Sequence, residues 1–350
     1  MGLKVVILTS GIPADAEATA RAGEALPESA ARALAPAQWL HDALVEAGHD
    51  VAPLHLSRAT KCDALATLRG FHADVVWPLS CAPLARTDRG TAVAEVLGLL
   101  GLPFVGCTAA VRRALAERAY VGNALERATA QGETPAGVAP HTVALCEQAV
   151  AMLDDAAMLG LVADAIPEGY PLCVKPACDA AEPRPQRVMT PEALARALDE
   201  ALAQAEGADR TALVQPWVEG VELRVPVLGD ADDVLVLPPV EVARASDTPA
   251  DTTRLVAPVR PASLSHDDAD AQAIRSEIER AAVDAYLACG CRDMGCVHLV
   301  WDGGRAIILG INPAPSLADD APLALAACAA DIPLATIADQ LVTIAAERGC

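Results

Sequence analysis

Short apolar runs alternate with amphipathic stretches over about the first 110 residues of the chain. The apolar runs have the length and composition of buried strands, and the amphipathic stretches repeat apolar residues at helical spacing. The predicted strands span residues 3–11, 51–57 and 73–80, and the predicted helices span 29–50 and 90–101. Because strand and helix alternate, we expect a parallel sheet covered by helices, which is an α/β unit.

The pattern changes after residue 112. Helical periodicity dominates the next hundred or so residues, around a strand at 170–177; the predicted helices are 110–132, 147–160 and 190–207. The last part begins with several strands and continues with a long helix at 270–290, a hairpin at 296–312 and a final helix. We therefore expect three consecutive domains: an N-terminal Rossmann-like parallel-sheet domain, a central α+β domain and a C-terminal α+β domain, at residues 1–112, 113–213 and 214–350.

Composition and charge narrow the class of protein. The net charge is −21, so the chain as a whole repels phosphate backbones and anionic lipid surfaces, and we expect neither nucleic acid nor a membrane as a partner. No apolar run reaches the roughly 18 residues of a membrane span, and the N-terminus enters a strand pattern without a signal peptide. The eleven cysteines lie mostly in apolar runs, as buried thiols do. We predict a cytoplasmic protein in a reducing compartment.

Two local features suggest chemistry. Lysine is rare, at positions 4, 61 and 175 only, so Lys175 in the buried strand YPLCVKPA is a candidate functional residue. A cluster of Cys289, Cys291, Cys296 and His298 has side chains that suit zinc but lacks the paired spacing of common zinc sites. A metal-binding protein using Cys296 and His298 is thus a third hypothesis beside the two given below.

Several motifs together cover nearly the whole chain. They are EATARAG at 17–23, YPLCVKPA, LVQPWVEGVELRVPVLG, and LACGCRDMGCVHLVWDGGRAIILGINPAPSL. In order and spacing they resemble motifs of the D-alanine–D-alanine ligases, which belong to the ATP-grasp superfamily. The resemblance implies a three-domain ATP-grasp fold. It also implies a reaction in which ATP activates one carboxylate as an acyl phosphate that a second amine attacks, and a homodimer paired through the N-terminal domain.

The resemblance assigns a nucleotide-binding role to several residues. Lys175 falls where the family lysine contacts ATP phosphates, and a second family lysine falls at Arg118. Gln215, Trp217 and Val218 lie in the hinge that reads adenine, and Glu222 lies at the ribose-binding glutamate. Glu17 falls where a glutamate holds the ammonium of the first amino acid. The Gln215 carbonyl oxygen can accept the adenine amino group, as the family's acidic residue does.

The catalytic and metal-binding positions depart from the family pattern. The transition-state arginine falls at Cys296, the first metal aspartate at His298 and the bridging glutamate at Gly310, so that only Asn312 is retained. The serine-rich phosphate loop becomes CDAAEPRP at 178–185, and the tyrosine- and lysine-bearing lid becomes RASDTP at 244–249. Mg²⁺ requires oxygen ligands, and imidazole is a poor substitute. We therefore expect weak, Mg²⁺-independent ATP binding.

Two hypotheses follow. In the first, the chain is a ligase-like pseudoenzyme with a structural or regulatory role, acting as a homodimer or with a protein partner and retaining residual nucleotide binding. In the alternative, it is a divergent but active ATP-dependent carboxylate–amine ligase joining D-alanine or another small amino acid. The alternative requires replacement cations near Lys175, and the candidates are Arg184, Arg187, Arg244 and Arg254.

Overall fold

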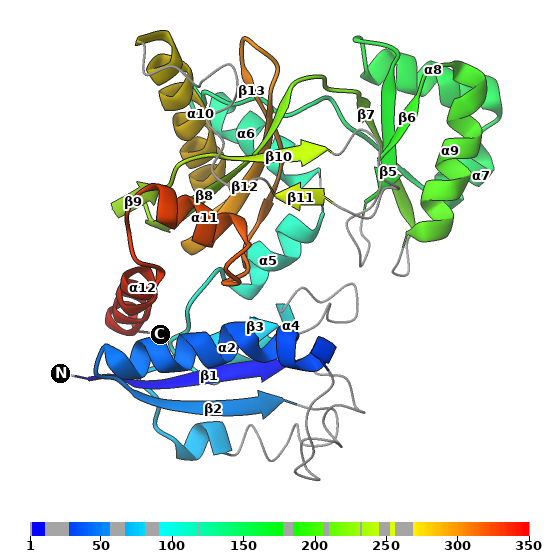
Figure 1. The fold of residues 1–350 in the computed structure, drawn as a ribbon. Coiled ribbons are helices and arrows are strands. Elements are labelled where there is room, and N and C mark those ends of the chain that lie inside the picture. The colour runs from blue at the N-terminus through cyan, green and yellow to red at the C-terminus, as the bar shows by residue number, and fades with distance from the viewer. Residues whose placement is uncertain are drawn as a thin grey trace.

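The computed structural model describes most of the chain. The described residues are 2–10, 28–56, 67–80, 91–117, 119–177, 185–205, 210–231, 233–244, 253–255 and 269–349. They form three separate sheets, each covered by helices (Figure 1).

The N-terminal sheet is parallel, as the alternation of strand and helix predicts. Its strands are β1 (Lys4–Ser10), β2 (Asp50–Leu56) and β3 (Val75–Ser80), in the order β2-β1-β3. Alternate residues of β1 enter two different cores: Val5 and Ile7 pack with α2 (Glu28–Glu46), and Val6 and Leu8 pack with α4 (Thr91–Leu99). A sheet buried on both faces accounts for its continuous apolar strands.

The second sheet is antiparallel and has four strands in the order β4-β7-β5-β6. Its helices lie on one face only, on the side away from the third sheet (Figure 1). The strands are β4 (Val143–Cys146), β5 (Leu172–Pro176), β6 (Gln186–Val188) and β7 (Thr211–Pro216), and the helices are α7 (Glu147–Met152), α8 (Asp155–Ala165) and α9 (Pro191–Gln204).

The third sheet is the largest, with the order β11-β10-β8-β12-β13 and β9 paired to β8. Its strands are β8 (Val221–Asp230), β9 (Asp233–Val236), β10 (Val240–Arg244), β11 (Thr253–Leu255), β12 (Asp293–Trp301) and β13 (Ala306–Asn312). One face packs against α6 (Tyr120–Ala130), α10 (Ala269–Ala288) and residues of α5 (Ala109–Ala116). The other face contacts α11 (Pro322–Ala329).

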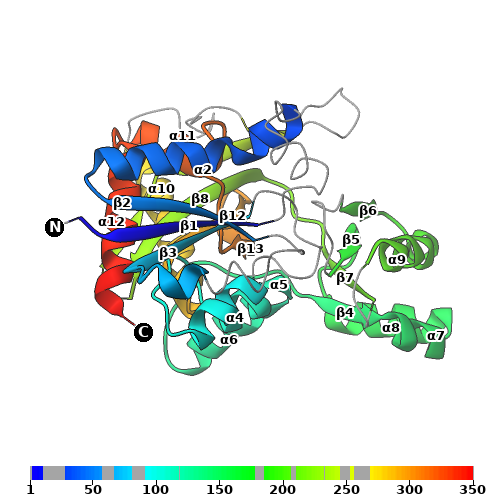
Figure 2. The ribbon, with the colours of Figure 1, turned by 90° about the horizontal axis from the view of Figure 1, so that it is seen from below.

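The C-terminal part of the chain packs against the N-terminal sheet. Helix α12 (Leu334–Arg348) packs with α2 and with β1 in one core, so the C-terminal helices lie against the N-terminal sheet (Figure 2). Beside this contact, Asp293 is fully buried and accepts two hydrogen bonds from Arg348, of 2.6 and 2.9 Å, and one from the Gly106 backbone. The ion pair thus joins the start of β12 to the chain terminus.

The structure corrects several element predictions. The helix expected at 110–132 is two helices, and the one expected at 147–160 is also two, since Asp154 caps a new helix by accepting a hydrogen bond from the Ala157 backbone. Pro238 and Pro239 divide the strand expected at 233–243, because proline has no N–H for the ladder. The final helix is a pair, α11 and α12, and β6 was not predicted.

The domain boundaries at 112 and 213 stay a prediction. Helix α6 packs on the third sheet, although it falls within the predicted central domain, and β7 belongs to the second sheet up to Pro216. Within the described residues, no single helix is long and apolar enough to cross a membrane. The pair α11 and α12 reaches such a length only across a 109° bend, and both helices contribute to a buried core.

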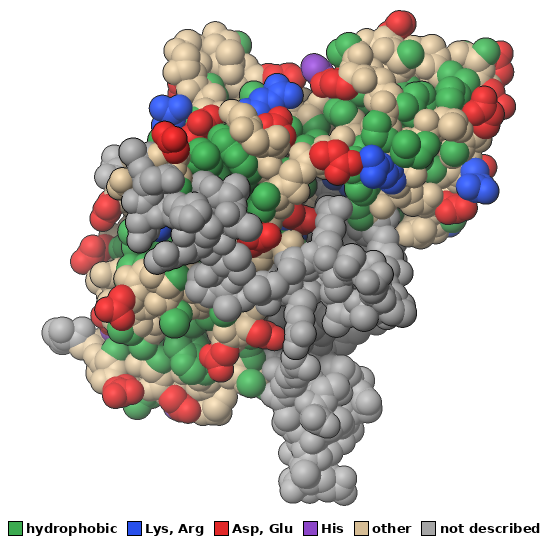
Figure 3. Space-filling model, turned by 45° about the horizontal axis from the view of Figure 1, so that its top comes forward, with side chains coloured by type: hydrophobic (Ala, Val, Ile, Leu, Met, Phe, Trp, Pro, Cys, Tyr) green, Lys and Arg blue, Asp and Glu red, His purple; other side chains and the backbone are tan. Residues whose placement is uncertain are grey.

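The surface agrees with the acidic composition. Acidic side chains are spread over the described part of the face shown in Figure 3, over all three units, with few basic ones between them. A ligand with negative charge therefore requires locally placed cations.

Candidate nucleotide-binding site

The helix-free face of the second sheet carries Lys175 and Gln215. Leu172 and Val174 of β5 point into the core beneath α8 and α9, so Cys173 and Lys175 point to the opposite face. In β7, which pairs with β5 through Cys173 and Gln215, the side chain of Gln215 shares that face. The sheet thus brings together two residues that lie 40 positions apart in the sequence, on the side of the third sheet.

The polar groups of this face are largely held within the protein. Lys175 and Gln215 are 8% and 4% exposed, and the Gln215 amide donates a hydrogen bond of 2.8 Å to Thr142 Oγ1. Because Thr142 holds the amide nitrogen, the side-chain carbonyl oxygen of Gln215 is also held in one orientation. The Trp217 backbone N–H donates to the Pro171 carbonyl at 2.8 Å, so this N–H is already paired within the protein. The adenine contact that the resemblance implies for the hinge would have to use other groups, such as those of Val218.

Arg187 is the candidate cation that the structure places on the same face. It stands opposite Cys173 in the pairing of β5 with β6, and its side chain is on the Lys175 side of the sheet. Its guanidinium lies 5.2 Å from the centre of the Trp217 ring and 2.6 Å from Glu219 Oε1. Arg187 therefore orders the hinge side chain at Trp217 by a cation–π contact.

The hairpin of β12 and β13 brings the predicted metal positions together. Cys296 pairs with Asn312, and His298 pairs with Gly310. A bulge follows at once, because Leu299 pairs with Ile308 and Leu309 is the extra residue. Bulges are common beside active sites, where they redirect a side chain. The pairing therefore places His298, Cys296 and Asn312 on one face of the hairpin, with Gly310 between them and without a side chain of its own.

These side chains do not make a magnesium site. The Asn312 Oδ1 atom accepts a hydrogen bond of 3.0 Å from the Ala314 backbone, and Gly310 offers no side chain. Cys296 is 2% exposed, and burial raises the pKa of its thiol to about 12, so the free thiol is protonated at neutral pH, and a soft thiol is a poor ligand for Mg²⁺. No group of three His, Cys, Asp or Glu side chains placed to hold a metal occurs among the described residues. The donor set does not fit Mg²⁺.

Sequence reasoning missed Arg224. It pairs with His298 across β8 and β12, so both side chains lie on the same face as Glu222, Cys296 and Asn312. Arg224 Nη2 donates to Glu222 Oε1 at 2.8 Å, and Arg224 is 8% exposed. Its charge also opposes the rise in the Cys296 pKa, so the two side chains are near one another. The signal was the alternation of Glu222 and Arg224 within an otherwise apolar strand.

Glu222 is thus already bound to a cation, although the resemblance predicts that it holds a ribose. Its side chain in the ion pair is 16% exposed, and that of Arg224 is 10% exposed. We call the face of the third sheet that carries Glu222, Arg224, Cys296, His298 and Asn312 the polar face. The opposite face, with Leu223, Val225, Val297 and Leu299, is largely apolar and packs against α10 and α6.

Other predicted site residues lie outside the described part of the chain. These are Glu17, Arg118 and most of the phosphate loop, 178–184, with Arg184. The backbone of Arg244 and Arg254 is described in β10 and β11, but their side chains are not, and the rest of the lid, 245–249, is outside. Of the four candidate cations, Arg187 alone has a described side chain.

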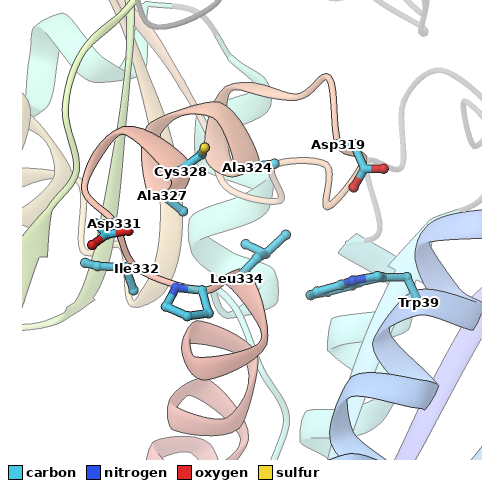
Figure 4. A pocket seen from close by; sticks show the side chains of 9 residues that line it. Trp39, Asp319, Ala324, Ala327, Cys328, Asp331, Ile332 and Leu334 are labelled. Atoms are coloured by element: carbon cyan, nitrogen blue, oxygen red, sulfur yellow. The ribbon is translucent and has the colours of Figure 1, made fainter.

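A separate hollow of about 410 Å³ lies between α2 and the C-terminal helices. It is lined by Trp39 of α2, by Asp319 before α11, and by residues of α11, α12 and their connection, among them Asp331 and Leu334 (Figure 4). It contains none of the predicted site residues.

The comparisons with known proteins decide the family. A model described as the D-Ala–D-Ala ligase C-terminus matches residues 143–343, more than half of the chain and all of the site described above. The chain belongs to the D-alanine–D-alanine ligase family. Its resemblance in sequence motifs is therefore confirmed, and so is the ATP-grasp fold, by the structures described next.

Two relatives match most of the length of this ligase-family protein. A D-alanine–D-alanine ligase of Desulforudis audaxviator is 26% identical over 99% of both chains, and one of Halorhodospira halophila is 29% identical over 77% of this chain and 78% of its own. Among solved structures, the D-alanine–D-alanine ligase of Bacillus anthracis complexed with ATP has a TM-score of 0.67 and 15% identity, covering 99% of this chain and 98% of its own. The VanG D-Ala:D-Ser ligase of Enterococcus faecalis has a TM-score of 0.72 and 15% identity, covering 99% of this chain and 100% of its own.

Proposed function

We propose that the protein binds an adenine nucleotide between the helix-free face of the second sheet and the polar face of the third, and that it does not catalyse Mg²⁺-dependent ligation. The observation that carries the proposal is the pairing of Cys296 with Asn312 and of His298 with Gly310. The hairpin is formed, with a bulge after the second pair, while neither strand presents a carboxylate at those pairs.

Nucleotide binding rests on the residues that fit it. Lys175 supplies a positive charge on the helix-free face, Gln215 supplies an oriented amide, and the hinge at Trp217 and Val218 connects the two sheets through residues 217–220. A relative's structure was solved with ATP, which supports this class of ligand. ATP bound here would bring its own negative charge, and this chain's cations would have to neutralise it without metal ions.

The proposed absence of ligation is argued from the charged groups that the hairpin does not present. Phosphoryl transfer depends on cations and metal ions that neutralise the transferred group in the transition state. Removing a single well-placed stabilising donor costs about 2.7–4 kcal/mol of barrier, and this hairpin departs from the family at Cys296, His298 and Gly310 together. The alternative, an active ligase, is favoured by the names of the relatives and is the opposite outcome of the same tests.

Calorimetric titration tests the binding half of the proposal. ATP and ADP are titrated into the full chain with Mg²⁺ and with EDTA, and into the variants Lys175→Ala and Lys4→Ala. We expect similar ATP affinity with and without Mg²⁺, about a tenfold or greater loss in Lys175→Ala, and no change in Lys4→Ala, whose lysine is exposed on the N-terminal sheet. Binding that requires Mg²⁺ would contradict the proposal, as would no binding at all.

A further inference from the structure

A buried arginine on the polar face has a placement that its own ion pair does not explain. Arg224 stands directly opposite His298 and is near Cys296, in the middle of the third sheet. Burying a guanidinium costs free energy, and the attraction to one carboxylate often does no more than offset that cost. Replacing a buried ion pair by apolar residues is often neutral for stability, so stability alone is a weak explanation for this pair.

The geometry of the ion pair is compatible with a second anion. A guanidinium carries five N–H donors in a rigid planar fork. In the described structure, Nη2 donates to Glu222 Oε1 at 2.8 Å and Nη1 donates to the Leu223 carbonyl at 3.3 Å. Glu222 therefore holds the guanidinium by one edge and fixes its orientation. An arginine positioned in this way binds phosphate or carboxylate oxygens through charge-assisted hydrogen bonds.

The neighbouring strand explains where such an anion would lie. On β12, His298 is directly opposite Arg224, and Cys296, a buried thiol, is the next residue on the same face. Among the five residues that define the polar face, Arg224 is the one permanently charged cation, and it is on β8. Lys175 supplies a second permanent cation from the face of the second sheet that is directed toward it.

We propose that Arg224 binds a phosphoryl group of the nucleotide, supplying from β8 the positive charge that β12 lacks at Cys296. The proposal rests on the proposed nucleotide binding and specifies it as a metal-independent site with one cation from each sheet. Glu222 is a positioning residue that aims the guanidinium. Because both positive charges belong to side chains and not to a metal ion, phosphate binding is expected to persist in EDTA and to weaken as the salt concentration rises.

The test compares Arg224→Gln with Arg224→Lys by calorimetry in EDTA, using ATP, adenosine and inorganic pyrophosphate as ligands. In Arg224→Gln we expect a loss of about tenfold to a hundredfold in affinity for ATP and pyrophosphate, as for a lost charged hydrogen bond, and no change for adenosine. Arg224→Lys should retain part of the affinity. The control is Arg196→Gln, which removes an exposed arginine of α9 and should bind as the wild type does.

A second variant separates anion binding from a structural role. Glu222→Gln removes a negative charge beside the guanidinium but keeps an amide oxygen that can still hold and orient it, so pyrophosphate should bind at least as tightly as to the wild type. If Arg224 merely held the sheet together, Glu222→Gln and Arg224→Gln would both weaken every ligand alike. Thermal unfolding of each variant shows whether it is folded at the temperature of the titration.

The outcomes distinguish this inference from the function on which it rests. Unchanged ATP affinity in Arg224→Gln, or an equal loss for adenosine and ATP, would overturn the role of Arg224 and leave nucleotide binding intact. Arg224-dependent binding of pyrophosphate by a protein that binds neither ATP nor adenosine would end the nucleotide proposal but keep the anion site. A wild-type protein that binds none of the three would end both.

Discussion

At the scale of single residues, the sequence identified Lys175 and Gln215 of the helix-free face and every residue of the polar face except Arg224. Lys175 was found because lysine is rare in this chain and stands in a recognisable motif, and Gln215 because the hinge motif is conspicuous. Arg224 was missed because the alternation of Glu222 and Arg224 in its strand does not show which residues of other strands they face. Only the pairing of Arg224 with His298 shows that it faces the site. Local sequence patterns do not predict which residues of two distant strands pair.

The thiols give a prediction at this scale. Burial raises the pKa of Cys289 and of Cys296 to about 12 each, so both stay protonated and unreactive at pH 8, whereas Cys328 is exposed. Iodoacetamide at pH 8, followed by peptide mass spectrometry, should modify Cys328 well before the other two. Early alkylation of Cys296 would contradict a buried neutral thiol at the position of the family arginine.

At the scale of elements, patterns predicted which segments are helical or extended better than where each one ends. Apolar periodicity runs through both 110–132 and 147–160, yet each region contains a break, because a capping residue such as Asp154 outweighs continued periodicity. The β12–β13 hairpin was predicted correctly, including its turn at Asp302. There the Asp302 carboxylate accepts hydrogen bonds from the Gly304 and Arg305 backbones, which lowers its pKa. The bulge at Leu309 was not foreseen.

The hairpin also allows a gain-of-function prediction. A Cβ atom built on Gly310 meets no atom within 4 Å, so a side chain can be added there without a clash. The double variant His298→Asp with Gly310→Glu places two carboxylates on facing residues next to Asn312. We expect ATP binding to the double variant to become stronger with Mg²⁺ than with EDTA.

The matched control is His298→Asn with Gly310→Gln, which adds side chains of the same size without charge. It should show the same ATP affinity with Mg²⁺ as with EDTA. If the carboxylate variant likewise showed no effect of Mg²⁺, these two positions would not explain the proposed Mg²⁺-independence.

At the scale of the whole molecule, the order of the three units was predictable and their connection was not. Each sheet was anticipated from its run of strands, but the return of α12 to the N-terminal sheet is a contact between the two ends of the sequence. The ion pair of Asp293 and Arg348 belongs to that contact. Its partners are separated by 55 residues, and no motif connects them.

Removing the buried charge should destabilise the assembled molecule. Asp293 is 0% exposed and binds both Arg348 and the Gly106 backbone, so Asp293→Ala leaves a guanidinium without its partner. We expect a loss of about 3–5 kcal/mol in the free energy of unfolding, measured by urea denaturation. The control Asp199→Asn, at an exposed position of α9, should change it by less than about 0.5 kcal/mol. Equal stability of the two variants would show that the pair does not hold the units together.

The most direct test of the account is an assay of ligation itself. The wild-type protein is incubated with ATP, Mg²⁺ and D-alanine, and both phosphate release and dipeptide are measured over time. The account predicts no phosphate above the D-alanine-free background and no D-alanyl-D-alanine, because the hairpin at Cys296, His298 and Gly310 presents neither the cation nor the carboxylates of a ligase. Saturable, D-alanine-dependent phosphate release with formation of the dipeptide would contradict it and identify an active ligase.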